Sequence, residues 1–158
     1  MPRYVHDGKT RVYWVPTIAN KAAPTVAELN AGTSLAAFLR KDGLDIPFTQ
    51  NFSDNADLED TFDAQSVGTF GANISLTIFR DDTTDTAWDL FVYGTAGYIV
   101  VRRGAAYSTA WAAAQKCEVY PAQMHEPTPL SSSTNENVAA KAMLAITDQP
   151  NLKATVAA

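Results

Sequence analysis

Short segments with the character of β-strands, separated by turns more often than by helices, constrain the fold of this chain most. Ile74, Leu76 and Ile78 alternate with Ser75 and Thr77, which predicts a strand with one buried face and one face toward water or a partner. A parallel sheet would need a helix in nearly every crossover. We therefore expect a mainly β fold, an antiparallel β-sandwich or barrel with one packed α-helix. The other strand segments are TRVYWVP (10–16), GYIVVRRG (97–104), KCEVYPAQM (116–124) and NVAAKAMLAI (137–146).

The packed helix is predicted over residues 82–93, DTTDTAWDLFVY. At 100° per residue the apolar side chains share one broad arc, and the acidic side chains share the opposite one. Asp82 is predicted to be the N-cap, Gly94 the C-terminal stop, and Trp88 and Phe91 the anchors against the sheet.

Two earlier segments have weaker signals. Pro24 and the spacing of Thr25 and Glu28 are typical of a helix start, and Gly32 of a helix stop, so a short helix or turn is expected there. Residues 35–43 fit a strand or a helix by period alone, and both readings stay open.

Residue patterns of catalysis or metal binding are absent from the sequence. Asp82, Asp85 and Asp89 share a helix face, but calcium needs about six to eight oxygen ligands in a wrapped loop, and no D-x-D-x-D-G motif occurs. The two histidines, His6 and His125, are expected at the surface or at a partner contact. The sequence has no G-x-S-x-G, GKS, GKT, C-x-x-C or H-E-x-x-H motif. We predict no metal, no cofactor and no enzymatic activity; a small hydrolase with an acidic site is the alternative.

Composition and charge restrict the class of protein further. A chain of 158 residues with 46% hydrophobic content suits one soluble domain over residues 1–158. The net charge of -5 has the wrong sign for tight binding of nucleic acid. Cys117 is the single cysteine, so no intrachain disulfide can form, and we expect it to be buried. No apolar run approaches the ~20 residues of a membrane span, and no signal-peptide core is visible.

The charges are unevenly distributed. Residues 42–89 carry eleven acidic side chains and one basic side chain, a net of -10, and the rest of the chain carries a net of +5. Residues 43–70 lack a hydrophobic period, which predicts either a long functional loop or a disordered segment. The loop is nevertheless rich in apolar side chains, which another subunit could bury while basic flanks complement the acids. The predicted interface comprises Phe48, Phe52, Asp54, Asp57, Leu58, Glu59, Asp60, Phe62, Asp63 and Phe70, with Arg3, Lys9, Arg11, Arg102 and Arg103 as the basic flanks.

Several blocks of sequence resemble a known family. RVYWVPTIANKAAPTVAELNAG, DTFDAQSVGTFG, LTIFRDDTTDTAWDLFVYGTAGYIVVRRG and EVYPAQMHEP are similar to the major tail tube proteins of long-tailed (siphovirus-type) bacteriophages, especially those that infect actinobacteria. The resemblance covers about residues 10–150. None of these blocks is a catalytic motif.

The resemblance implies a structural role in the virion tail, after assembly in the host cytoplasm. It implies a β-sandwich or barrel that joins itself into hexameric rings, with the interface loop ordered between subunits. The rings would stack around a tape-measure protein, meet a tail terminator and distal tail or baseplate proteins at the tube ends, and let DNA pass without specific binding. Exposed terminal arms, MPRYVHDGK and LKATVAA, would act between rings. The alternative is another phage or secretion-system tube or ring component, such as a tail terminator or a contractile-system inner tube.

Overall fold

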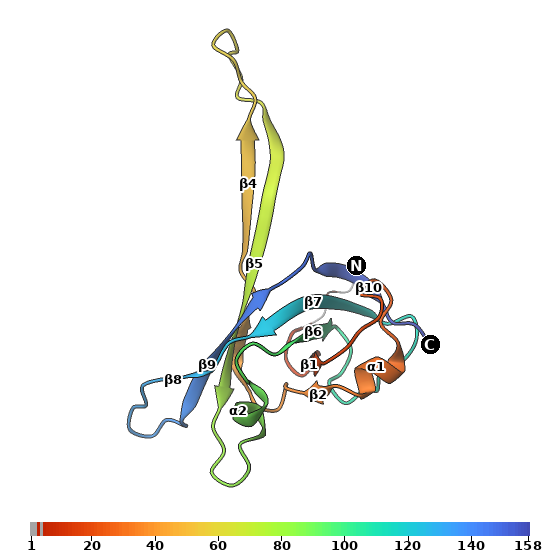
Figure 1. Cartoon of the computed structure of the whole chain (residues 1–158), viewed down its shortest axis with the longest axis vertical. Helices are drawn as coiled ribbons and strands as arrows, with labels where there is room; N and C mark the ends of the chain where they lie inside the picture. Colours follow the sequence, from red (N-terminus) through yellow and green to blue (C-terminus); the bar gives the residue numbers. More distant parts are fainter. Residues whose placement is uncertain (1–2, 4) are drawn as a thin grey trace.

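The polypeptide forms one strongly curled antiparallel sheet, seen in a computed structural model that describes residue 3 and residues 5–158. Its strand path runs β2-β1-β6-β7-β9-β5-β3, while β10 pairs with β7, β4 with β5 and β8 with β9 (Figure 1). The elements are β1 (Thr10–Val15), α1 (Val26–Asn30), β2 (Thr33–Ser34), β3 (Leu39–Asp45), β4 (Phe48–Asp54), β5 (Gln65–Phe79), α2 (Thr86–Leu90), β6 (Ala96–Arg103), β7 (Lys116–Met124), β8 (Thr128–Pro129), β9 (Ala139–Ile146) and β10 (Asn151–Thr155). The mainly β, antiparallel prediction is confirmed, as a half-barrel rather than a closed one.

Both faces of the central strands are buried, which explains their continuous apolar runs. Val12 and Trp14 of β1 point to one core, and Tyr13 and Val15 point to the other. The first, which we call the inner core, takes side chains from β1, β6, β7, β9, β5 and β3 and so lies on the concave face. The second, the outer core, is built on β1, β6 and β7 and covered by α1 and by the C-terminal segment.

A close contact between Gly97 of β6 and Trp14 sets the packing of the inner core. A Cβ atom added at Gly97 would lie 2.4 Å from Cζ2 of the indole. Gly97→Ala is therefore expected to lower the free energy of unfolding by about 1–3 kcal/mol through overpacking, measured by urea denaturation. Gly71→Ala is the matched control, because a Cβ there meets nothing within 4 Å. Equal stability of the two variants would show that Trp14 can move aside.

The short helix α1 begins with the predicted capping box. The Thr25 hydroxyl accepts a hydrogen bond from the Glu28 amide (3.3 Å), and the Glu28 carboxylate accepts one from the Thr25 amide (2.8 Å). The hydrogen bonds that the Glu28 carboxylate accepts from the backbone amides of Thr25 and Ala19 lower the pKa of Glu28. The prediction of a short helix or turn at residues 24–32 is thus confirmed, as a helix, and the open segment 35–43 contains the start of β3.

The second helix, α2, is shorter than predicted, and the assignment of Asp82 as its N-cap is wrong. The helix covers only Thr86–Leu90, so that Asp82 lies in the turn before it and accepts a hydrogen bond from the Thr83 hydroxyl (3.0 Å). Asp85 holds the N-cap position, but its carboxylate forms an ion pair with Arg80 instead of capping the helix. The local ion pair therefore replaces the cap that the spacing suggested.

The two predicted anchors of α2 differ in burial. Phe91 follows the helix and is 3% exposed in the inner core. Trp88 is half-buried at the edge of that core, and the Arg80 guanidinium lies 3.7 Å from its ring centre. Trp88 therefore acts partly as a platform for a cation, which the helical pattern did not indicate.

The C-terminal segment is part of the fold, which corrects the prediction of an exposed arm at LKATVAA. Asn151–Thr155 form β10 against β7, and Ala154 and Val156 are buried in the outer core. The Ala157 amide also donates to the Pro24 carbonyl (2.8 Å), which ties this end to the start of α1. At the other end, residues 1–2 and 4 of MPRYVHDGK lie outside the described residues, and residues 5–8 are exposed.

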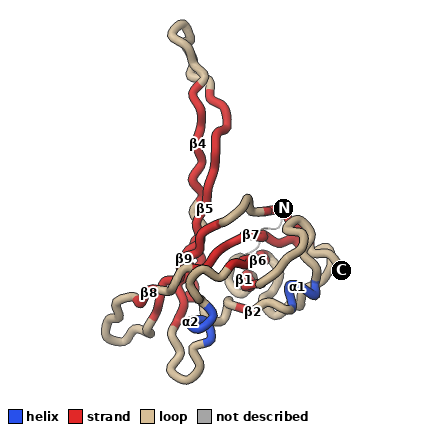
Figure 2. The backbone as a smooth tube through the Cα atoms, in the orientation of Figure 1, coloured by secondary structure: helices blue, strands red, loops and turns tan. Residues whose placement is uncertain are grey.

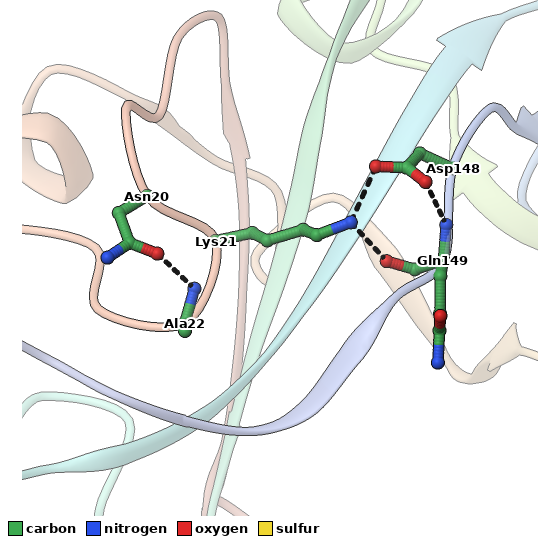
Figure 3. A network of polar contacts seen from close by, with 5 residues as sticks. All are labelled: Asn20, Lys21, Ala22, Asp148 and Gln149. Atoms are coloured by element: carbon green, nitrogen blue, oxygen red, sulfur yellow. Dashed lines mark hydrogen bonds and ion pairs between the residues drawn. The ribbon is translucent and has the colours of Figure 1, made fainter.

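A long-range polar clamp holds the approach to β10 (Figure 3). Lys21 Nζ lies 2.5 Å from Asp148 Oδ2 and donates to the Gln149 carbonyl (2.9 Å). The hydrogen bond and charge of Lys21 lower the pKa of Asp148. The clamp joins chain segments that are 127 residues apart.

Removing this clamp should have a pH-dependent effect on stability. A carboxylate with a lowered folded-state pKa stabilises the fold above its unfolded pKa of about 3.9 and loses this contribution as the pH falls through the folded value. Lys21→Met should therefore lower the melting temperature slightly at pH 7, and the difference from wild type should be smaller near pH 2, where only the hydrogen bond from Lys21 to the Gln149 carbonyl remains. Lys153→Met is the control, because Lys153 forms no ion pair among the described residues. A difference in melting temperature that is as large at pH 2 as at pH 7 would contradict this account.

Candidate assembly surface

A β-hairpin that projects far from the half-barrel is the most prominent feature of the molecule (Figures 1 and 2). β4 pairs with the first half of β5, from Phe48 opposite Ala72 to Asp54 opposite Gln65. The prediction that residues 43–70 form a long loop or a disordered segment is therefore wrong, because strands cover most of this range. The sequence concealed the hairpin because its strands are exposed on both faces and a register shift between Gln50 and Phe52 interrupts their alternation.

One face of the hairpin carries a stripe of apolar side chains that we call the hairpin stripe. Residues that pair across the two strands have their side chains on the same face. Gln50 and Phe52 of β4 pair with Phe70 and Val67 of β5, so a step of two residues in β4 matches a step of three residues in β5. The extra residue, a β-bulge, therefore lies in β5. This register places the five apolar residues on one side. The stripe consists of Phe48, Phe52, Val67, Phe70 and Ala72.

The hairpin stripe continues the inner core beyond the body of the subunit. Ala72 lies on the same face of β5 as Ile74 and Leu76, because alternate residues of a strand share a face. Ile74 and Leu76 are fully buried in the inner core. At the base Phe48 is half-buried against that core, whereas farther out Phe52 is 60% and Val67 is 87% exposed. An apolar surface that leaves the core and stays uncovered along an arm is typical of an interaction site.

The hairpin ends in an acidic turn, residues 54–63, which we call the tip. Three of its five acidic residues shape the turn: Asp54, Asp57 and Asp60 accept hydrogen bonds from the amides of Ala56, Glu59 and Asp57, at 3.0, 2.9 and 3.1 Å. Glu59 and Asp63 accept no hydrogen bond among the described residues. The two large apolar side chains of the tip, Leu58 and Phe62, are 104% and 79% exposed. The tip thus presents two exposed apolar side chains among five acidic residues.

Several of the predicted basic partners of the acids are engaged within their own subunit, and Arg102 is not at the surface at all. Its side chain is 1% exposed, and burial lowers the pKa of its guanidinium. Arg103 is engaged within the subunit too, because its Nε lies 3.0 Å from a carboxylate oxygen of Glu118. Arg11 donates to the Thr109 carbonyl (2.7 Å). The prediction of Arg102 as an interface residue is therefore wrong, since it is needed inside its own subunit.

Arg102 organises the loop between β6 and β7. Nη1 donates to the Ala110 carbonyl (3.2 Å) and to Gln115 Oε1 (3.0 Å). Nη2 donates to the carbonyls of Ala106 (3.1 Å) and Thr109 (2.7 Å). The same guanidinium lies 4.9 Å from the ring centre of Trp111 in the outer core. The side chain therefore satisfies the backbone of a loop that has no regular structure.

A cavity of about 550 Å³ opens at the seam where the half-barrel fails to close. β1 lies near one end of the sheet path and β3 at the other, and residues of both line this seam pocket. Its apolar lining comprises Val12, Ala36, Ala37, Leu39 and Leu44, and its charged lining comprises Asp7, Arg11, Arg40 and Lys41. Asp7 is the single carboxylate in the lining, and a hydrogen bond from Lys41 lowers its pKa. An acid/base carboxylate pair is thus missing from this pocket.

Some other features bear on possible ligands and environment. Cys117 is 4% exposed, as predicted, and burial raises the pKa of its thiol to about 11. Among residues 3 and 5–158, no three His, Cys, Asp or Glu side chains come together in a group that could hold a metal ion. None of the helices in this part of the chain has the length and apolar character to cross a membrane.

Comparison with known proteins agrees with the fold. A family model described as "Phage tail tube protein" matches residues 1–158. A solved structure of the anti-feeding prophage baseplate contains a chain of similar fold, with a TM-score of 0.59 and 12% sequence identity. The alignment covers 94% of this chain and 93% of that chain. The comparison with curated proteins finds no match.

Proposed function

The chain belongs to the phage tail tube protein family, and we propose that it polymerises as stacked hexameric rings to form the tail tube of a long-tailed phage that infects actinobacteria. In this role the tube is the conduit through which the genome enters the host. The projecting hairpin with its uncovered stripe is the observation that supports self-assembly, because a monomer has no way to bury it. The subunit would assemble in the host cytoplasm and function in the virion tail.

The contact between subunits is proposed to be heterologous. The hairpin of one subunit would lie against a different surface of its neighbour, and such head-to-tail contacts close into rings or extend as filaments. Interface energy would come mainly from the hairpin stripe, with Phe48, Phe52 and Phe70 as its aromatic members. The acidic side chains of the tip would set register and direction.

The net charge of -5 suits a conduit for DNA. Binding of a duplex depends on contacts between basic side chains and phosphates, and a surface of like charge denies those contacts. DNA would therefore pass without specific binding. The remaining partners are proposed to be a tape-measure protein in the lumen, and a tail terminator and distal tail or baseplate proteins at the ends.

Assembly of the purified protein tests this function. We expect tubes in negative-stain electron micrographs above a threshold concentration, and we expect the double substitution Phe52→Ser, Val67→Ser to raise that threshold at least about tenfold. Loss of two large apolar contacts from an interface is worth more than the 1.4 kcal/mol that corresponds to a factor of ten. Circular dichroism should be unchanged, because both side chains are exposed in the subunit. Equal threshold concentrations for variant and wild type would show that the hairpin stripe is not part of the interface.

A second candidate is a tube or ring component of a contractile or secretion-like particle. The similarity of fold to a chain of the anti-feeding prophage baseplate favours it. Micrographs separate the tail tube from a ring component, since the tail tube predicts open-ended tubes of variable length and a ring component predicts single closed rings.

A further inference from the structure

The seam pocket and the hairpin tip have complementary chemistry on distant parts of one molecule. The pocket combines an apolar lining with three basic side chains, Arg11, Arg40 and Lys41. The tip combines two exposed apolar side chains with five acidic residues and no basic residue. We propose that the seam pocket receives the hairpin tip of a second copy of this chain, an inference that rests on the assembly proposed above.

The apolar parts fit this assignment. Leu58 and Phe62 stand fully or almost fully in water in the single subunit, and burial of such side chains is worth about 1.5–3 kcal/mol each. The pocket lining at Val12, Leu39 and Leu44 offers an apolar floor, and its volume of about 550 Å³ lies within the range of a site for a few side chains. Contact between the tip and the pocket would bury both apolar surfaces, which stabilises the contact.

The charged parts can rearrange to accept the tip. Lys41 now pairs with Asp7 at 2.9 Å, and Arg40 pairs with Asp42 at 3.0 Å. These are open ion pairs, with Lys41 82% and Arg40 55% exposed, and such pairs contribute little and exchange partners readily. Glu59 and Asp63, which do not hold the turn together, are the carboxylates available to replace Asp7 and Asp42.

The occupant must come from another subunit. The tip stands clear of the half-barrel at the far end of the hairpin, so it is out of reach of the pocket in its own chain (Figure 1). Tip and pocket are different surfaces, and their contact is therefore heterologous, as a tube requires. The seam of each half-barrel would then be covered by its neighbour.

Charge exchange tests the pairing. The tip variant carries Glu59→Lys and Asp63→Lys, the pocket variant carries Arg40→Glu and Lys41→Glu, and the combined variant carries all four. Each half-variant should raise the threshold concentration for tubes at least about tenfold, since it places like charges together across the contact. The combined variant should return to within about threefold of wild type, because it restores opposite charges. All four side chains are exposed, and circular dichroism verifies the fold.

The possible failures have different meanings. Wild-type protein that never forms tubes would overturn the proposed function and this inference with it. Wild-type tubes together with half-variants that assemble normally, or with a combined variant that is not rescued, would overturn only the pairing of tip and pocket.

Cross-linking gives an independent readout. Leu58→Cys at the tip and Ala37→Cys in the pocket, placed in one chain, should yield disulfide-linked dimers and larger species under mild oxidation of assembled protein. The native Cys117 is buried and its thiol has a pKa raised to about 11, so it does not compete. Each single substitution is the control and should give no ladder. Tubes that form without cross-links in the double variant would overturn the proposed contact.

Discussion

Replacement of residues 50–70 by an Asn-Gly turn should abolish tube formation and leave the half-barrel folded. Thr49 and Gly71 are opposite each other in the hairpin, so a two-residue turn of type I′ can join them. The deletion removes the tip and most of the hairpin stripe, including Phe52, Val67 and Phe70. These side chains are about half to almost fully exposed, so the subunit loses little of its own core.

The measurement is sedimentation of wild type and deletion variant over a range of concentrations, with thermal unfolding of both. We expect the variant to remain monomeric at concentrations at least about a hundredfold above the wild-type threshold, because loss of several buried aromatic and apolar contacts exceeds 2.8 kcal/mol. Its melting temperature should lie within a few degrees of wild type. Tubes formed by the variant would show that the hairpin is dispensable, and unfolding of the variant would show that it belongs to the core.

Arg102→Ala should cause the largest loss of subunit stability of the polar substitutions, about 2–4 kcal/mol. The substitution removes four hydrogen bonds from a charged donor, three of them to backbone carbonyls in one loop. Release of the buried guanidinium from its desolvation offsets part of this loss, and the freed carbonyls can meet water, which limits the total. Trp111 also loses the cation that lies against its ring.

Two matched variants separate hydrogen bonding from charge. Arg102→Lys keeps the charge but cannot serve both pairs of acceptors at once, so it should recover only part of the stability. Arg103→Ala removes the neighbouring, partly exposed arginine and should cost no more than about 1 kcal/mol. Urea unfolding of the three variants measures these differences. If Arg102→Ala and Arg103→Ala are equally stable, the loop between β6 and β7 does not depend on Arg102.

The strands of the half-barrel could be predicted because their environment leaves a clear pattern. β1, β6 and β7 are buried on both faces and read as continuous apolar runs, while β5 near Ile74 and Ile78 alternates. The capping box of α1 was readable for a similar reason, since Thr25 and Glu28 interact within one turn of helix. These elements are determined by interactions between residues close in sequence, and their sequence pattern therefore predicts them.

The elements that were missed depend on contacts that are distant in sequence or absent from the subunit. β10 contains small and polar residues, and it is a strand because β7 offers it an edge. The outer half of the hairpin is solvated on both faces, so it lacks a hydrophobic period. The burial of Arg102 could have been predicted from the alternation of β6. Arg102 lies two residues after Val100, so its side chain is on the same face of the strand and points toward the outer core. Charge alone had suggested the surface.

The sequence predicted which segment forms the candidate assembly surface, but not that this segment is a β-hairpin. The sequence indicated that residues 43–70 contact another subunit, because this segment has apolar side chains with no predicted place in the core. This contact stays a prediction. The structure adds that these side chains share one face of an arm and that Asp57 and Asp60 shape its turn. Neither property can be read from composition, because both depend on register and on the hydrogen bonds of the turn.

A reconstruction of the assembled protein by electron cryomicroscopy tests the central claim most directly. The account predicts an open-ended tube of stacked rings in which the hairpin of each subunit lies on a neighbour, with the hairpin stripe covered. Particles that remain monomers at high concentration, or tubes in which the hairpins stand free in solvent, would contradict it.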